Sequence, residues 1–162
     1  MKCLFKILAL LLIGVLMSCG PDSSESGGKP KPTKYAKKNN PEGALNEWQL
    51  IHGMGPIKEE MKLDPIDEKI AASGQKIFET KCSVCHKMSE RYVGPPLGDV
   101  AIRRSPEFIM NMILDPASMI KYHPEVKRLL AQYYTPMAFQ NVTEEDARKI
   151  LEYLRLEART SH

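Results

Sequence analysis

Two kinds of hydrophobic pattern divide this chain of 162 residues. Near the start, an unbroken apolar run over residues 7–17 follows Lys2 and Lys6. The run is too short to span a bilayer as a helix, which takes about 20 residues. A basic start with a short apolar core is typical of a secretory signal peptide, which we predict over residues 1–18.

From residue 67 onward, apolar side chains recur at helical spacing and no convincing strand pattern occurs. Four helices are expected here: over residues 67–81, from Ser105-Pro106 to Asp115-Pro116, from Pro124 to before Pro136, and from Thr143 onward. Ser105 is suited to be an N-cap and Pro106 a first helical residue. The last helix is expected to bury Ala147, Ile150, Leu151 and Leu154. The pattern therefore predicts an all-α domain over residues 67–162.

Two stretches separate the signal from this domain. Residues 19–43 are rich in Gly, Ser, Pro, Lys and Asn, so they bury too little apolar surface to offset the entropy cost of ordering. We expect a flexible linker there. Residues 44–66 form an N-terminal extension with a short expected helix, Ala44–Ile51, which Gly53 ends. Trp48, the single Trp, indicates that the extension packs on the domain.

The formal net charge of +3 is unevenly distributed. The signal and the linker each contribute +2, whereas residues 44–162 carry 16 basic and 17 acidic side chains. No nucleic-acid-binding surface is therefore expected on the domain. The linker lysines could touch anionic lipid headgroups, although a solvated spacer is the simpler interpretation.

The end of the apolar run, Leu16-Met17-Ser18-Cys19, resembles the lipobox of bacterial lipoproteins, although Met17 departs from the residue types usual there. The resemblance implies that Cys19 becomes the lipidated N-terminus. Several acyl chains would anchor it firmly, because two membrane signals suffice for stable attachment. We therefore expect a periplasm-facing lipoprotein on the inner or the outer membrane. The alternative is an ordinary signal peptide with a chance Cys.

The sequence Cys82-Ser83-Val84-Cys85-His86 has the C-x-x-C-H form typical of c-type haem attachment. Two thiols three positions apart can reach the two vinyl groups of one porphyrin, and His86 then supplies an imidazole to the iron. A zinc site would need a second ligand pair, and a thioredoxin-like dithiol would need a βαβ context. A disulfide within the motif would close a very small loop. Since Cys3 leaves with the signal and Cys19 is lipidated, one covalent haem accounts for every Cys.

With its surroundings, this motif makes residues 67–158 resemble the small monohaem class I cytochromes c. Four features occur in the family's order: Gly74 and Phe78 at four-residue steps before Cys82, the haem motif, Gly94-Pro95-Pro96-Leu97, and Tyr134-Thr135-Pro136-Met137. The resemblance implies about four to five helices around one haem. It implies that the Pro95 carbonyl accepts a hydrogen bond from His86 and that Leu97 packs on the haem. It also implies that the first helix crosses the last, which presents Leu151, Tyr153 and Leu154.

The sixth iron ligand has several candidates in the mature chain. They are Met54, Met61, Met88, Met110, Met112, Met119 and Met137, with His52, His123 and His162. Met137 is preferred because it follows a proline on a loop between two helices, as in the family's Met loop. Met119, expected in a loop, is the runner-up, whereas Met110 and Met112 are expected to fill a core. His123 is expected to be a surface cap.

The haem propionates also need partners, and the domain after Cys82 contains no Trp to donate to them. The candidates are Arg91, Tyr92, Arg103 and Arg104. A solvated approach to the following helix is an equally simple interpretation of the arginine pair. The stretch 93–141 is longer than in the smallest family members, and residues 119–134 are expected to cover one haem edge.

Ligation by His and Met fills both axial positions of the iron. We therefore expect reversible one-electron transfer through an exposed haem edge, not enzymatic catalysis. The implied partners are redox proteins: a quinol-oxidising donor complex and an acceptor oxidase or reductase. Stretches 92–97 and 103–114 resemble small cytochromes associated with nitrous oxide reduction, which implies a donor role to that reductase. The alternatives are a haem enzyme or gas sensor with a displaceable sixth ligand, and a non-haem redox or metal lipoprotein.

Overall fold

The computed structural model describes residues 44–160, all of which belong to one compact unit, Ala36–His162. The predicted signal peptide (residues 1–18), the lipidation site Cys19, the predicted linker (residues 19–43) and His162 lie outside the described residues. Among the helices of the described part, none combines the length and apolar character needed to cross a bilayer.

Every regular element in residues 44–160 is an α-helix, which confirms the all-α class. The helices are α1 (Glu47–His52), α2 (Glu68–Lys81), α3 (Val100–Arg103), α4 (Pro106–Leu114), α5 (Pro116–Tyr122), α6 (Pro124–Tyr133) and α7 (Glu144–Thr160). Five of these match the helices expected from the sequence. The other two, α3 and α5, are short and were not expected.

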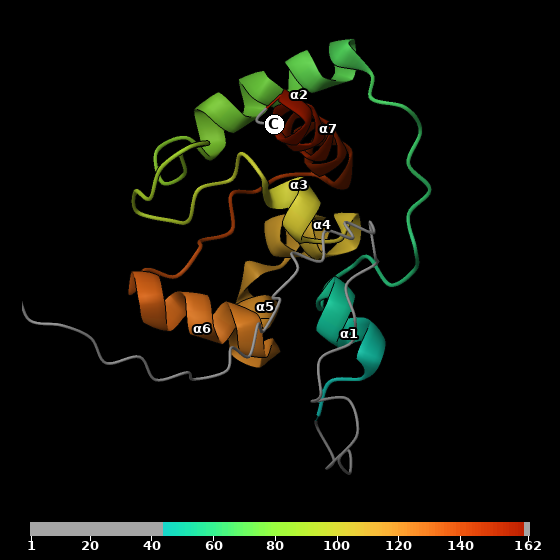
Figure 1. Ribbon diagram of the computed structural model, residues 1–162. Helices are drawn as coiled ribbons and strands as arrows, with labels where there is room; N and C mark the ends of the chain where they lie inside the picture. Colours follow the sequence, from blue (N-terminus) through green and yellow to red (C-terminus); the bar gives the residue numbers. More distant parts are fainter. Residues whose placement is uncertain (1–43, 161–162) are drawn as a thin grey trace, which may run out of the picture. The chain divides into compact units, whose positions relative to one another are not determined.

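Helices α2 and α7 cross in close contact (Figure 1). Gly74 marks the crossing, because a Cβ at this position would overlap the carbonyl oxygen of Lys149. One turn later, Phe78 packs edge-on against Tyr153 with ring centroids 5.5 Å apart. The stripe predicted for α7, which comprises Ala147, Ile150, Leu151 and Leu154, is buried. The helix crossing expected from the family resemblance is therefore confirmed.

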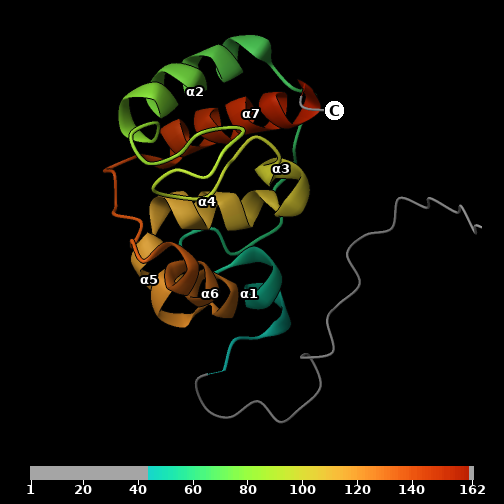
Figure 2. The same ribbon diagram turned by 60° about the vertical axis from the view of Figure 1, so that its left-hand side comes forward.

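Helix α4 lies between the α2–α7 pair and a second group formed by α1, α5 and α6 (Figure 2). It begins as predicted, with the Ser105 Oγ accepting the Phe108 N–H at 3.2 Å and Pro106 in the first turn. One core cluster includes Phe78, Ile109, Met110, Ile113, Ile150, Leu151 and Leu154, and a second contains Phe108, Met119 and Val126. Helix α4 therefore contributes to both clusters.

Residues 116–122 form α5 and not the loop expected from the sequence. Asp115 ends α4 and also caps α5, where its Oδ1 accepts the Ser118 N–H at 3.0 Å. Pro116 can follow the end of one helix and equally occupy the first turn of the next, and here it does both. Met119 is thereby fixed on a helix with no exposed surface, and its sulfur accepts the Met54 N–H at 3.1 Å.

His123 is the cap residue between α5 and α6, as expected, but only 2% of its surface is exposed, so its prediction as a surface residue is wrong. Its Nε2 lies 3.2 Å from the Leu50 carbonyl oxygen, and its ring packs edge-on against Phe108 at 5.2 Å. Burial lowers the pKa of His123, although the Leu50 contact acts in the opposite direction. The ring is therefore a neutral part of the interior at pH 7.

The N-terminal extension is joined to α4 through a buried carboxylate. Glu107 is 2% exposed, its Oε2 lies 2.7 Å from His52 Nδ1, and its Oε1 accepts the Met61 N–H at 2.7 Å. Both contacts come from residues 44–66. The single carboxylate thus binds the extension at two points.

A buried amide adds a further attachment of the extension. Asn111 accepts the Ile57 N–H at 2.9 Å and donates to the carbonyl oxygens of His52 and Ile57 at 3.0 and 2.9 Å. Trp48 stacks on the His52 ring with centroids 3.8 Å apart. The extension therefore packs on the domain, as its Trp indicated.

Candidate cofactor-binding site

The predicted haem-attachment segment follows α2 without a break. Cys82 is the C-cap of the helix, and its N–H donates to the Phe78 carbonyl at 2.8 Å. The N–H groups of Cys85 and His86 both donate to the Cys82 carbonyl, at 3.0 and 2.9 Å. The motif thus forms one tight turn, which holds both thiols and the imidazole close together.

The next part of the chain folds back onto this turn. The Gly94 N–H donates to the Cys85 carbonyl at 2.8 Å, and the Leu97 N–H donates to the Lys87 carbonyl at 3.0 Å. These bonds fix Pro95, which lies between the two donors, against the motif. A residue nine positions away is thereby brought to the His86 ring.

A cavity of about 460 Å³ lies beside this segment, within the range typical of cofactor sites. All six residues predicted to hold the haem lie on its wall, namely Cys82, Cys85, His86, Pro95, Leu97 and Met137. Much of the remaining wall is apolar and comes from Phe78, Phe108, Ile109, Ile113, Val126, Leu129, Leu130, Ile150 and Leu154. A flat apolar ring system with two thiol attachment points fits this arrangement.

His86 is held in one orientation. Its Nδ1 lies 2.9 Å from the Pro95 carbonyl oxygen, so Nδ1 carries the proton and Nε2 remains available as a ligand. Gly94 lies against the same ring, since a Cβ at that position would come 2.5 Å from Cε1. Burial lowers the pKa of His86 and outweighs the opposing hydrogen bond to Pro95. The imidazole is therefore neutral at pH 7, which is the form that binds a metal.

No disulfide joins Cys82 and Cys85. Burial raises the pKa of Cys82 to about 11, so this thiol is protonated at neutral pH in the chain without its cofactor. Within residues 44–160, no three His, Cys, Asp or Glu side chains converge as a cluster able to hold a metal ion. The chemistry of the site is that of thioether attachment next to an imidazole.

Two methionines lie on the cavity wall, Met137 between α6 and α7 and Met112 on α4. Met110 is fully buried in the core cluster, as expected for a core-filling residue. The runner-up Met119 is not on the wall, because α5 directs it into the second cluster. Helical periodicity alone predicts Met112 to be a core residue. The structure places it on the cavity wall, which makes it a second candidate for the sixth ligand.

Charged side chains line one part of the wall. Arg103 and Arg104 lie there, whereas the other proposed propionate partners, Arg91 and Tyr92, do not. Arg104 pairs with Glu125 on α6, which also pairs with Arg128 at 2.7 Å.

The hydrogen bond from Arg128, with the charge of Arg104, holds the pKa of Glu125 below its usual value despite burial. No sequence pattern indicated this cluster, since Glu125 and Arg128 lie at the start of an amphipathic helix, where charges are usually solvated.

Helix α6 contributes its apolar stripe to the wall. Val126, Leu129, Leu130 and Tyr133 all line the cavity. From α5 only Ile120 does so within the described residues. The expectation that residues 119–134 cover one side of the haem is thus supported mainly by α6.

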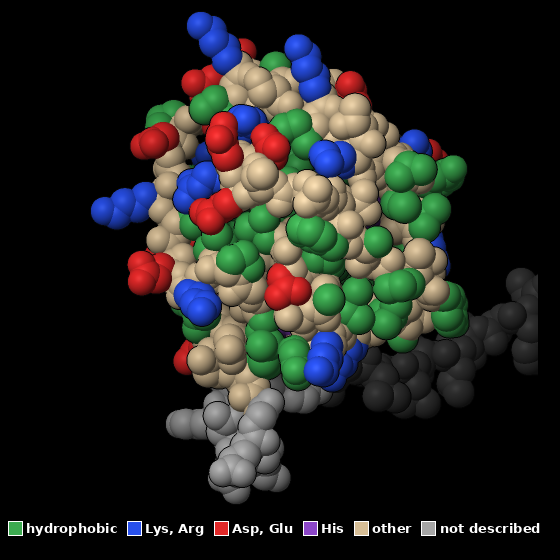
Figure 3. Space-filling view, turned by 180° about the vertical axis from the view of Figure 1, so that it is seen from behind, with side chains coloured by type: hydrophobic (Ala, Val, Ile, Leu, Met, Phe, Trp, Pro, Cys, Tyr) green, Lys and Arg blue, Asp and Glu red, His purple; other side chains and the backbone are tan. Residues whose placement is uncertain are grey.

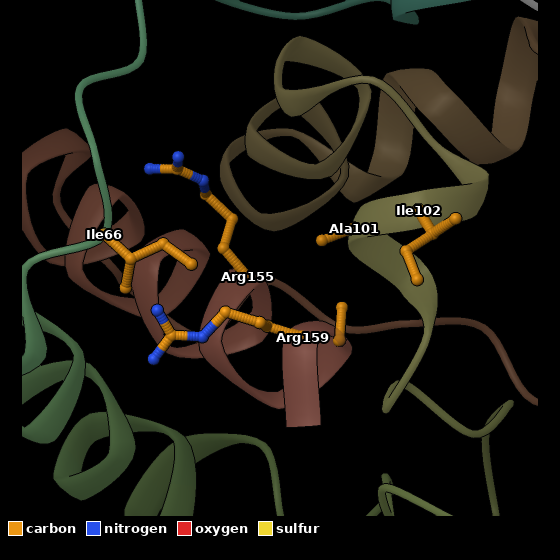
Figure 4. Close-up of a pocket in the computed structure, with 6 residues that line it drawn as sticks. Ile66, Ala101, Ile102, Arg155 and Arg159 are labelled. Atoms are coloured by element: carbon orange, nitrogen blue, oxygen red, sulfur yellow. The ribbon is translucent and has the colours of Figure 1, made fainter. Parts of the chain in front are cut away.

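A second hollow of about 430 Å³ lies elsewhere and includes none of the predicted site residues. It is lined by Ile66, Ala101, Ile102, Arg155, Ala158 and Arg159, and its two arginines come from α7 (Figure 4). Arg155 donates to Glu152 at 2.6 Å and to the Asp64 carbonyl at 2.9 Å, and Arg159 pairs with Glu68 at 3.3 Å. These arginines therefore attach α7 to the start of α2 and to the segment just before it.

A helical domain with a C-x-x-C-H turn, an imidazole held by a proline carbonyl and an apolar cavity beside them has the features of a c-type cytochrome. Residues 71–156 match the sequence profile of the family described as Cytochrome c, and the chain belongs to this family. It is accordingly a monohaem class I cytochrome c that binds haem c covalently and acts as a haem-based electron carrier.

The structure is similar to that of a cytochrome c from Rhodothermus marinus, with 42% sequence identity and a TM-score of 0.66. The match covers 71% of this chain and 99% of that chain. An engineered form of the R. marinus cytochrome is 42% identical with a TM-score of 0.65, covering 68% of this chain and 96% of that one. A structure of the engineered form bound to a carbene intermediate also matches, at a TM-score of 0.62.

Among curated proteins, the chain is 28% identical over 103 residues to the photosystem II extrinsic protein V of Synechococcus sp. (strain JA-2-3B'a(2-13)). The match covers 55% of this chain and 55% of that protein, so the chain spans about half the length of this relative.

Proposed function

We propose that this cytochrome is a membrane-tethered, periplasmic one-electron carrier whose haem iron is ligated by His86 and Met137. The observation that carries the proposal is the cavity wall, which brings together the two attachment thiols, the oriented imidazole and Met137. The bound haem supplies an iron that alternates between its ferric and ferrous states. The protein residues hold that group, orient its ligands and exclude water.

Of the two methionines on the cavity wall, Met137 is the better candidate for the sixth iron ligand. Met112 is held within α4, whose backbone fixes its Cα, whereas Met137 lies in a non-helical connection that can adapt to its target. A thioether ligand and an apolar wall both favour ferrous iron, so they support a potential higher than two nitrogen ligands would give. With both His86 and Met137 as ligands, the iron would have no open position for a substrate.

The surface near the cavity suits contact with another protein. Exposed hydrophobic side chains occur on two segments that border the cavity. Between His86 and Pro95, Tyr92 is 54% and Val93 38% exposed. Between α6 and α7, Tyr134 is 86% and Phe139 57% exposed. A view from behind shows hydrophobic side chains gathered on one side of the domain (Figure 3). We propose that a redox partner docks over Tyr92, Val93, Tyr134 and Phe139, because an apolar surface around the haem edge permits close approach without desolvating charges.

The tether and the partners complete the proposal. Lipidation at Cys19 would hold the carrier at a membrane, while residues 19–43 give it reach. A quinol-oxidising complex is the proposed donor, and an oxidase or a reductase, such as nitrous oxide reductase, is the proposed acceptor.

The test is ligand replacement in the haem-loaded protein. Met137→Ala should abolish the sulfur-to-iron charge-transfer band of the ferric form, because the thioether leaves the iron. Met112→Leu, a change of similar volume on the same wall, should leave the band intact. Loss of the band in Met112→Leu with retention in Met137→Ala would reverse the assignment.

A haem enzyme is the second candidate function, favoured by the carbene intermediate named for the engineered R. marinus cytochrome. Carbon monoxide binding to the ferrous protein distinguishes an electron carrier from a haem enzyme. In the carrier, binding to the ferrous wild-type protein is slow or incomplete and becomes rapid in Met137→Ala. Rapid and complete binding to the wild type would favour the enzyme.

A further inference from the structure

The connection that carries Met137 has little regular structure of its own. It begins at Tyr134 and ends at Asn141, and both have left-handed backbone conformations, with φ of 58° and 52°. In the described part of the chain, no backbone-to-backbone hydrogen bond involves residues 135–142. Residues 134–141, which we call the Met137 loop, thus depend on other contacts for their position between α6 and α7 (Figure 1).

One such contact comes from the residue directly before the first haem-attachment cysteine. The Lys81 Nζ donates to the Gln140 carbonyl oxygen at 3.0 Å, and the side chain is half-buried on the cavity wall. Gln140 is three residues after Met137. The end of α2 and the far end of the Met137 loop are therefore joined beside the cavity by a charge-assisted hydrogen bond.

A second contact comes from the segment between His86 and Pro95. The Arg91 Nη2 donates to the Gln132 carbonyl oxygen at 2.8 Å, and its guanidinium lies 4.4 Å from the centroid of the Tyr133 ring. Gln132 and Tyr133 directly precede the Met137 loop. The two cations, both from the haem-attachment side, therefore hold the chain on each side of Met137.

We propose that Lys81 and Arg91 are positioning residues that keep the Met137 loop closed over the haem and so set how readily the sixth ligand leaves the iron. The inference rests on Met137 ligation, proposed above. The loop has a closed form with Met137 in the cavity and an open form with the sulfur withdrawn. Lys81 bonds to a carbonyl within the loop and Arg91 to one just before it, each only in the closed form, so each cation shifts the equilibrium toward that form.

The test measures imidazole binding to the ferric, haem-loaded protein, since imidazole competes with the sixth ligand. Lys81→Met should tighten apparent imidazole binding by about tenfold, the order expected from loss of one charge-assisted hydrogen bond. Arg91→Met should have a smaller effect of about threefold, because Arg91 is exposed. The double variant should exceed either single variant.

Two kinds of control accompany these variants. Lys76→Met removes the same charge from an exposed site on the same helix and should leave imidazole binding within about twofold of the wild type. The conservative changes Lys81→Arg and Arg91→Lys keep a donor and should restore most of the wild-type resistance to imidazole. Covalent haem staining on a denaturing gel verifies that each variant is loaded.

Unchanged imidazole binding in both Met variants, or an equal change in Lys76→Met, would overturn the inference. Should Lys81→Met fail to load haem, the comparison of Arg91→Met with Arg91→Lys tests the inference instead, because Arg91 is exposed. Failure of the ligation proposal gives a different result, because Met137→Ala would then keep the charge-transfer band. A band lost in Met137→Ala together with unchanged imidazole binding in the double variant rejects the positioning role alone.

Discussion

At the scale of single residues, two glycines are required by what lies against them. Gly74 allows α2 to approach the Lys149 carbonyl on α7, and Gly94 allows the chain to lie on the His86 ring. Neither glycine has a left-handed backbone conformation, so glycine is required at these positions by lack of space for a Cβ and not by backbone freedom. Both belong to the features that carry the family resemblance, Gly74 by its place before Cys82 and Gly94 as the first residue of Gly94-Pro95-Pro96-Leu97. The atoms that exclude a Cβ are distant in sequence or become close only when the loop folds.

Gly74→Ala should destabilise the haem-loaded protein by about 2–3 kcal/mol, because overpacking against a backbone carbonyl forces the two helices apart. Denaturant unfolding followed by circular dichroism measures this. Ser73→Ala, at the adjacent exposed position, should change the free energy of unfolding by less than about 0.5 kcal/mol. Equal effects of the two substitutions would show that the crossing tolerates a Cβ.

At the scale of elements, the N-terminal extension behaves as part of the domain. Its residues contact α4 mainly through polar side chains buried on that helix, Glu107 and Asn111. Burial alone would raise the pKa of Glu107, but hydrogen bonds from the Met61 N–H, its own N–H and His52 together lower it. A carboxylate whose pKa is lower in the folded state stabilises the protein above its unfolded pKa of 4.5, and this stabilisation is lost as pH falls further.

Glu107→Gln should lower the free energy of unfolding at pH 7 by about 1–3 kcal/mol, since a buried charged hydrogen-bond acceptor is removed. The difference from the wild type should shrink as pH falls below about 4.5, because the unfolded wild-type chain then binds a proton more readily than the folded one and the stabilisation from the carboxylate is lost. Unfolding titrations between pH 7 and pH 3 test this.

The exposed Glu59, on the same extension, provides the control, because Glu59→Gln should match the wild type throughout. Comparison at each pH also cancels the contribution of His123. Burial lowers the pKa of that residue, so its own stabilising contribution declines as pH falls through 6.5 in every variant. A Glu107→Gln difference that is constant from pH 7 to pH 3 would contradict the assignment.

At the scale of the whole molecule, the cavity joins the two hydrophobic clusters. Phe78, Ile109 and Ile150 of the first cluster line it, and so do Phe108 and Val126 of the second. A haem bound there completes both clusters at once. In a domain this small, such a shared apolar surface is a large part of what stabilises the fold.

The chain expressed without haem maturation should therefore lose its single cooperative thermal transition. Hydrogen exchange should show α6 and the Met137 loop losing protection first, because α6 faces the cavity with its apolar stripe. The α2–α7 pair, which packs directly, should keep more of its protection. Equal protection of α6 with and without haem would show that the helix is held independently of the cofactor.

The outcome for particular elements shows how far sequence reasoning reached. Ser105-Pro106 located the start of α4, because a helix cap is a short-range signal that acts within a few residues. The crossing of α2 with α7 at Gly74 was implied by the family resemblance, since no local signal relates residues so far apart in the chain. Helix α5 was missed because an Asp-Pro pair can both end one helix and begin the next, and only contacts of Met119 with distant residues show which occurs.

The sequence by itself determined the cofactor chemistry of this protein, since thioether attachment and an adjacent imidazole require residues that are neighbours in the chain. It also determined the helical periodicity that makes the domain all-α. Only the tertiary structure decided which methionines face the cavity, that His123 is buried, and that Lys81 and Arg91 hold the chain around Met137. Each of these depends on groups far apart in sequence, and their distances are set by the packing of whole helices.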